Sequence, residues 1–145
     1  MTGRGVEQVV SGVTVIDDSF NGNPASVAAA LQSLQARSMS GGRRIAVLGD
    51  MLELGDDAPR YHTGLAAHLA GIDGVYCVGP LMRHLFDALP AGKGLGWHED
   101  PATLRPEEVA NLLKAGDVVV VKGSKKMFWV NKFVPALVAA LQAKA

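Results

Sequence analysis

Four consecutive valines at positions 118–121 constrain the fold of this 145-residue chain more than any other feature. β-Branched side chains disfavour a helix, and an apolar run without polar alternation is typical of a strand that is covered on both faces. Residues 45–48 and 75–78 are similar short apolar runs, and residues 13–16 form a fourth strand candidate. Because strands of this kind occur in parallel sheets with helices on both sides, we expect an α/β fold.

Helical patterns separate the apolar runs. Apolar residues at helical spacing predict helices near residues 24–36, near 58–70, after Pro80 and from Pro106 to Gly116, and Trp97 is placed on a short strand. Asn23 is a natural N-cap for the first helix, and Pro24 suits its first position. Tyr61, Leu65 and Leu69 recur every four residues in the helix near 58–70. The expected inward stripe of the last helix is Val130, Phe133, Val134, Leu137, Val138 and Leu141. Alternating strands and helices predict a three-layer Rossmann-like domain with a mostly parallel sheet, and we expect residues 1–145 to form a single domain.

The composition argues against several classes of function. The chain has 14 basic and 14 acidic side chains, so its formal net charge is zero and no electrostatic footprint for nucleic acid is present. No run approaches the roughly 20 apolar residues of a membrane span, and we expect no membrane insertion. The single Cys77 excludes an internal disulfide and is expected to be a buried thiol. With no signal-peptide pattern at its start, the chain is predicted to be cytoplasmic.

Polar side chains gather just after the first of these strands. Asp17, Asp18, Asn21 and Asn23 lie within seven residues, and they lead into a predicted helix N-terminus. Carboxylates and amides in this position suit ribose hydroxyls and adenine edges, which need both acceptors and donors. The alternative is an Asx-rich turn that caps the helix without binding a ligand.

A second polar loop follows residues 45–48. Gly49 permits a close approach of a ligand, and Asp50 and Glu53 follow it. These acidic side chains could receive a substrate ammonium group, or they could form a solvated acidic loop. His62 is expected on the surface of the next helix, and the four histidines of the chain show no spacing typical of metal ligands, so we predict no metal site.

The third loop follows the valine strand. Lys122 emerges where the strand ends and can present a charge to a carboxylate or phosphate, while Gly123 and Ser124 can add backbone N–H donors. Lys125 and Lys126 are expected to point to solvent.

The sequence lacks several familiar catalytic patterns. No G-x-x-x-x-G-K-[ST] phosphate loop is present, and no G-x-G-x-x-G follows the first strand. No Ser–His or Cys–His nucleophile pair can be identified from residue spacing, so we predict no catalytic residue within this domain. We expect instead that Asp17, Asn21, Asp50 and Lys122 converge at one rim of the sheet, because ligands bind beyond the carboxyl ends of parallel strands.

With these residues considered together, the chain resembles the C-terminal domain of the Mur ligases over about residues 3–141. Residues 17–24 are similar to the family's D-D-S-Y-N-A-N-P signature, with Phe20 in place of tyrosine and Gly22 in place of alanine. Residues 47–55 with His62 downstream, and residues 117–124, match two further motifs in the family's order. The resemblance is closest to the members that add D-alanyl-D-alanine.

The resemblance implies an ATP-dependent amide ligation in peptidoglycan synthesis, with UDP-N-acetylmuramoyl-tripeptide and D-alanyl-D-alanine as substrates. It implies that Asp17, Asp18, Asn21 and Asn23 contact the nucleotide. Asp50, Lys122, Gly123 and Ser124 would orient the dipeptide. ATP and Mg²⁺ would be held mainly by a central domain. This sequence contains neither that central domain nor the UDP-sugar domain, so the chain alone should not catalyse ligation.

Two other classes of protein remain as alternatives. A signalling receiver domain also carries paired aspartates and a late lysine, but it needs a phosphate-accepting aspartate after its third strand, where this chain has Gly79 and Pro80. A stand-alone nucleotide-binding or scaffolding module is the other alternative.

Overall fold

The computed structural model describes residues 3–144 and contains one six-stranded sheet. The strands are β1 (Val6–Val10), β2 (Val13–Asp18), β3 (Arg44–Gly49), β4 (Gly74–Val78), β5 (Gly94–His98) and β6 (Val118–Lys122). Their order across the sheet is β1-β2-β6-β3-β4-β5, and all neighbours are parallel except the antiparallel pair β1 and β2. The prediction of a mostly parallel sheet is therefore confirmed.

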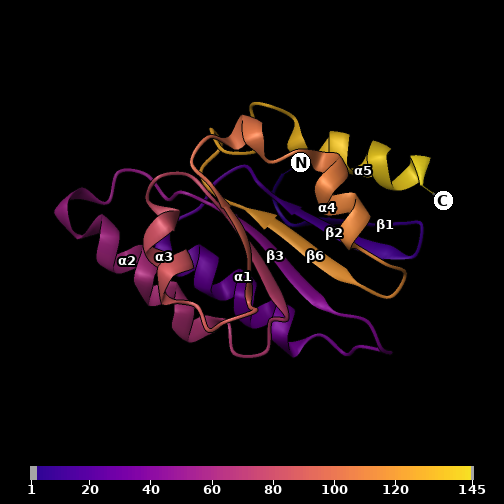
Figure 1. Cartoon of the computed structure of the whole chain (residues 1–145), viewed down its shortest axis with the longest axis horizontal. Coiled ribbons are helices and arrows are strands. Elements are labelled where there is room, and N and C mark those ends of the chain that lie inside the picture. Colours follow the sequence, from indigo (N-terminus) through magenta and orange to yellow (C-terminus); the bar gives the residue numbers. More distant parts are fainter. Residues whose placement is uncertain (1–2, 145) are drawn as a thin grey trace.

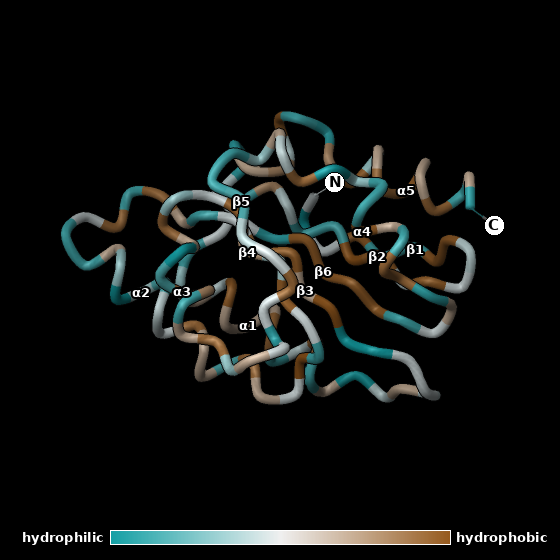
Figure 2. Tube along the Cα trace, in the orientation of Figure 1, coloured by the Kyte–Doolittle hydropathy of each residue, from teal (hydrophilic) through white to brown (hydrophobic). Residues whose placement is uncertain are grey.

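Helices cover both faces of the sheet, which gives three layers (Figure 1). The α-helices are α1 (Pro24–Ala36), α2 (Ala58–Gly64), α3 (Met82–Ala88), α4 (Pro106–Leu112) and α5 (Phe133–Ala143). The buried side chains form two apolar clusters, one under α1, α2 and α3 and the other under α4 and α5. The valines of β6 alternate between them, with Val119 and Val121 in the second cluster and Val118 and Val120 in the first. Figure 2 shows these hydrophobic segments gathered in the central strands.

Local signals account for the start of α1. The Asn23 side chain accepts a hydrogen bond from the Ser26 backbone N–H at 2.9 Å, and the Ser26 hydroxyl lies 3.0 Å from the Asn23 backbone N–H. This reciprocal capping box satisfies donors that the first helical turn leaves free, and Pro24 occupies a position where its missing N–H costs nothing. The predicted bounds and cap of this helix are confirmed.

Other predicted elements are also confirmed. Trp97 lies on β5, and Cys77 is fully buried within β4. Lys125 and Lys126 are exposed, as expected. No helix within residues 3–144 is long and apolar enough to cross a membrane.

Two of the predicted helices differ from the structure, and one strand was missed. Val130 does not belong to the stripe of the last helix: it is 64% exposed, and α5 begins only at Phe133, because Lys132 takes a left-handed conformation that interrupts the helix. The helix predicted near residues 58–70 is α2 followed by a 3₁₀ turn, Leu65–His68, and Tyr61 is 41% exposed while Leu65 and Leu69 are buried. Strand β1 was not predicted at all.

The signal for β1 lies in its turn rather than in its side chains. Most residues of β1 are exposed because it is an edge strand, so no apolar run marks it. Ser11 and Gly12 join it to β2 with φ of 52° and 80°, the two positive values that a tight type I′ hairpin requires. A Ser-Gly pair between two valine-containing runs was therefore the available indication.

Candidate functional site at the carboxyl edge of the sheet

The three polar loops meet at the carboxyl ends of β2, β3 and β6. Strand pairing places Lys122 beside Asp18 on one side and beside Leu48 on the other. Lys122 Nζ lies 3.0 Å from Asp18 Oδ2 and donates to the backbone oxygen of Asn21 at 3.0 Å. The Ser124 backbone N–H donates to the Asp50 backbone oxygen at 3.0 Å. Residues that are remote in the sequence therefore share one rim, as predicted for Asn21, Asp50 and Lys122, whereas the Asp17 side chain turns to the other face of the sheet.

Three glycines allow this close approach. A Cβ on Gly123 would lie 2.9 Å from the Cα of Gly49, and a Cβ on Gly22 would lie 3.0 Å from the carbonyl carbon of Gly123. Both neighbours are backbone atoms, which cannot rotate away as a side chain can. The loops after β2, β3 and β6 can touch only because these positions lack side chains.

The buried Lys122 ammonium is already paired within the domain. Its side chain is 6% exposed, and that of Asp18 is 25% exposed. An ammonium group has three donors, and Asp18 and the Asn21 carbonyl accept from two of them. The main role of the Lys122 ammonium is therefore to hold the first loop in place. Asp18 is the more accessible member of the pair.

Asp17 and Asp18 lie on opposite faces of the sheet, since successive side chains of a strand alternate. Asp18 is on the face covered by α1, whereas Asp17 is on the face covered by α5. Asp17 Oδ1 accepts hydrogen bonds from both the backbone N–H and the hydroxyl of Ser19. The two aspartates therefore do not face one common site, although the sequence analysis assigned both to the nucleotide.

Asp50 is buried, with 2% exposure, and its carboxylate caps the turn that leads into α3. It accepts from the backbone N–H groups of Leu81 at 3.1 Å and Met82 at 2.8 Å. Burial raises the pKa of the Asp50 carboxyl, and these two hydrogen bonds only partly offset that effect. Gly79 packs against the carboxyl group so tightly that a Cβ would lie 2.3 Å from Asp50 Cγ. The carboxylate thus has structural partners and is not among the residues that line the hollow described below.

His62 is completely buried, so the expectation of a surface histidine was wrong. Its Nδ1 lies 2.7 Å from the Ala58 carbonyl oxygen, and its Nε2 lies 2.9 Å from the Met51 backbone N–H. A carbonyl only accepts and an N–H only donates, so the ring must be neutral, with its proton on Nδ1. His62 thereby ties the loop after β3 to α2, a role that surface-helix periodicity could not reveal.

A hollow of about 280 Å³ opens between the three loops. Its lining consists of Phe20, Asn21, Gly22, Leu52, Glu53, Ser124, Lys125 and Lys126. The Ser124 hydroxyl is buried at this edge and has no hydrogen-bond partner within residues 3–144. An unsatisfied buried hydroxyl is rare in native proteins and points to a missing partner. Lys125 and Lys126 outnumber Glu53 in this lining, and the sequence analysis had not assigned these two positive charges to a site.

The amides of the first loop have partly local roles. Asn21 is exposed, and its side-chain oxygen accepts from the Gly22 backbone N–H at 2.9 Å. Asn23 is the helix cap described above, so its side-chain oxygen has the capping role that the Asx-turn alternative foresaw. Each amide still has an NH₂ group with no partner in the hydrogen bonds of residues 3–144. No cluster of three or more potential metal ligands occurs within the same residues.

These features define a three-layer α/β domain of the Rossmann-like class, with its polar loops gathered at the carboxyl edge of the sheet. Residues 5–125 match the model of the family described as Mur ligase, glutamate ligase domain. The chain belongs to this family.

Individual relatives agree with the family match. The UDP-N-acetylmuramoyl-tripeptide–D-alanyl-D-alanine ligase of Escherichia coli (strain K12) is 34% identical over 122 residues, covering 81% of this chain and 25% of that protein. The ligase of the same name from Mycobacterium tuberculosis (strain CDC 1551 / Oshkosh) is 37% identical over 139 residues, covering 78% and 26%. The crystal structure of MurF ligase from Thermotoga maritima in complex with ADP superposes with a TM-score of 0.83 at 26% identity, covering 100% of this chain and 32% of that one. The chain therefore spans about a quarter of the length of these curated relatives.

Proposed function

We propose that this chain is the C-terminal domain, and a single domain, of a UDP-N-acetylmuramoyl-tripeptide–D-alanyl-D-alanine ligase that acts in peptidoglycan synthesis. In the parent enzyme the tripeptide carboxylate would attack the γ-phosphorus of ATP, forming an acyl phosphate and releasing ADP. The amine of D-alanyl-D-alanine would then attack the acyl carbon, and inorganic phosphate would leave as the amide bond forms. The family match and the names of the relatives support this assignment.

The observation that carries the proposal is the unpaired Ser124 hydroxyl beside the lysine-rimmed hollow. A dipeptide brings one peptide amide, which can pair with the hydroxyl, and one carboxylate, which Lys125 or Lys126 can attract. The Asp50 backbone oxygen, bonded to the Ser124 N–H, holds this loop in place. Asp50 and Lys122 would thus position the dipeptide site from behind, while Ser124 and the backbone of Gly123 would contact the substrate.

The nucleotide contacts of this domain would come from Asp18, Asn21 and Asn23. The partly exposed Asp18 carboxylate can accept from ribose hydroxyls, and the two asparagine NH₂ groups can donate to the base. The Asp17 carboxylate faces away from them, so we do not carry its predicted nucleotide contact into this proposal.

The isolated domain should be inactive and should bind ATP weakly. It has no phosphate loop, and the triphosphate and Mg²⁺ would be held mainly by the central domain of the parent enzyme. That central domain and the N-terminal UDP-sugar domain would be the partners of this domain. The parent enzyme would be cytoplasmic. Mg²⁺ would supply charge neutralisation for phosphoryl transfer. A titration that showed tight, magnesium-dependent binding of ATP to this chain would contradict the proposed division of roles.

The test is Ser124→Ala in the parent ligase, assayed with UDP-N-acetylmuramoyl-tripeptide, ATP and D-alanyl-D-alanine. Loss of one hydrogen bond to the dipeptide should raise its KM about tenfold and leave the KM for ATP unchanged. Ser40→Ala, at an exposed position in the turn before β3, is the matched control and should change neither value. An unchanged KM for the dipeptide in Ser124→Ala would remove the hollow from the substrate site.

A further inference from the structure

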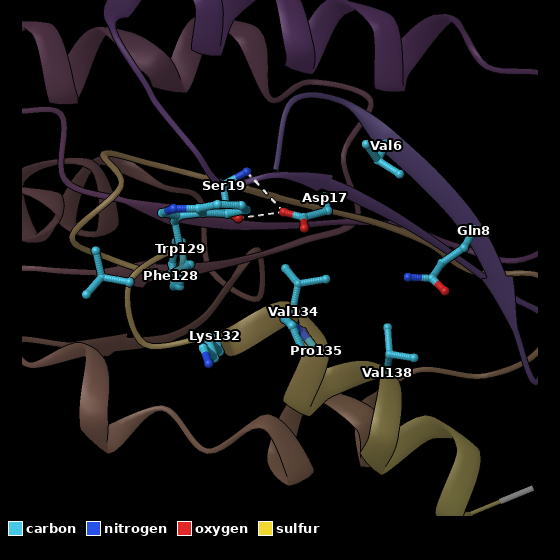
Figure 3. Close-up of a pocket in the computed structure, with 11 residues that line it drawn as sticks. Val6, Gln8, Asp17, Ser19, Phe128, Trp129, Lys132, Val134, Pro135 and Val138 are labelled. Carbon is cyan, nitrogen blue, oxygen red and sulfur yellow. Dashed lines mark hydrogen bonds between the residues drawn. The ribbon is translucent and has the colours of Figure 1, made fainter. Parts of the chain in front are cut away.

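A second and larger cavity lies on the opposite face of the sheet, between β1, β2 and the start of α5 (Figure 3). Its volume is about 620 Å³, and it is open to solvent on one side. Asp17 and Ser19 form its polar end, and Phe128, Trp129, Val134 and Val138 form most of its apolar wall. None of the contacts in the proposed ligase function uses this cavity.

The cavity has two charged lining residues, Asp17 and Lys132, and the Asp17 carboxylate is its acidic group. It is nine-tenths buried, with 9% exposure, and only its Oδ1 has hydrogen-bond donors, both from Ser19. Within residues 3–144, Oδ2 accepts no hydrogen bond and no basic side chain forms an ion pair with this carboxylate. Figure 3 shows the carboxylate at the cavity, with one oxygen turned to Ser19 and the other free. Oδ2 therefore keeps its full capacity to accept a hydrogen bond, and a positively charged donor would form the strongest one, so this end of the cavity favours a cation.

The walls favour an apolar body next to that charge. Val6 and Val130 line the cavity with exposures of 39% and 64%, and they are two of the four large hydrophobic residues that the described chain leaves exposed. Covering them would remove apolar surface from water. The Trp129 ring is also part of the wall, and an aromatic face attracts ammonium groups and other rings. Lys132 lies across the cavity from Asp17 in Figure 3 and does not neutralise it.

We propose that this cavity binds a small organic primary ammonium ion with a hydrocarbon or aromatic body. The ammonium group donates to Asp17 Oδ2, and the body lies against Val134, Val138 and Trp129. A metal ion fits less well, because the Asp17 carboxylate, the Ser19 hydroxyl and the Gln8 amide supply too few oxygen ligands, and the cationic Lys132 lines the same cavity. Binding is non-covalent and does not depend on the proposed ligase function, because Asp18, and not Asp17, faces the loops of that site.

The experiment is an NMR titration of ¹⁵N-labelled protein with phenethylamine at neutral pH, with phenethyl alcohol as the neutral probe of similar shape. We expect phenethylamine to shift the amide signals of Asp17 and Ser19 and the indole signal of Trp129. Phenethyl alcohol should bind at least about tenfold more weakly, since it lacks the charge-assisted hydrogen bond. Asp17→Asn should lower the affinity for phenethylamine by a similar factor, and Asp56→Asn, at an exposed position that does not line the cavity, should not change it.

A second variant keeps the charge and fills the space. Val138→Phe should reduce phenethylamine binding at least about tenfold while Asp17 is intact, because the larger ring occupies the cavity. It therefore decides the question even if Asp17→Asn fails to fold. N-acetyl-lysinamide serves as a third probe: binding as tight as that of phenethylamine would identify the occupant as a lysyl side chain, and weaker binding would identify it as a free amine. Equal affinity for the amine and the alcohol, or an affinity unaffected by Asp17→Asn and Val138→Phe, would overturn the proposal.

Discussion

Asp50→Ala should destabilise the domain strongly, because the Asp50 carboxylate caps the turn before α3 from within the core. The variant leaves the backbone N–H groups of Leu81 and Met82 without their acceptor, and the site is too deeply buried for water to replace it freely. Hydrogen bonds to a charged group are worth about 1.5–3 kcal/mol each. Removing the carboxylate also removes the cost of burying it, a cost that its raised pKa reflects.

Combining these effects, we expect the free energy of unfolding to fall by about 2–4 kcal/mol. For a domain of this length the melting temperature should drop by about 5–15 °C. The free energy of unfolding of Asp50→Asn should lie between those of Asp50→Ala and the native protein. Its amide oxygen can accept a hydrogen bond from one N–H, while its NH₂ group faces the other donor.

Urea denaturation followed by circular dichroism measures the effect directly. Asp56→Ala is the matched control, because Asp56 lies in the same loop and is exposed, and we expect a change within about 0.5 kcal/mol. If Asp50→Ala lowered the free energy of unfolding by less than about 1 kcal/mol, the carboxylate would not be the structural cap described here, and its predicted contact with a substrate ammonium would regain support.

Two further predictions concern other buried polar groups. His62→Ala should lower the free energy of unfolding by about 3–5 kcal/mol, since it empties a fully buried position and leaves the Met51 N–H without its acceptor. Urea denaturation would measure this loss, and a value below about 1 kcal/mol would contradict the pairing. Burial acts to raise the pKa of Asp117, but hydrogen bonds from Arg43 and from two backbone N–H groups outweigh it and hold that pKa below its ordinary value of 3.8. The stabilising contribution of the Asp117 carboxylate is therefore present above pH 3.8 and is lost as the pH falls through the lower folded pKa. The free energy of unfolding of Asp117→Asn should vary less than that of the native protein from about pH 5 to pH 2. Equal pH dependence of the two free energies would refute this assignment.

Local patterns were sufficient for most of the elements. The valine run of β6 and the Asn23 and Pro24 start of α1 act over a few residues, so their structures follow from short-range sterics and capping. Strand β1 was missed because an edge strand needs no apolar face, and the extent of the last helix was wrong because Lys132 takes a left-handed conformation that residue spacing does not encode.

The sequence by itself determined the fold class and the three polar loops, and its motifs indicated the family, because alternating apolar runs and strand-end glycines are properties of the linear chain. Only the tertiary structure decided what each polar side chain faces. In the folded chain His62 is buried, and the Asp50 carboxylate accepts from the turn before α3. Lys122 pairs with Asp18, whereas Asp17 lies on the opposite face of the sheet. Burial and partner choice depend on how distant segments pack, and no spacing within one loop contains that information.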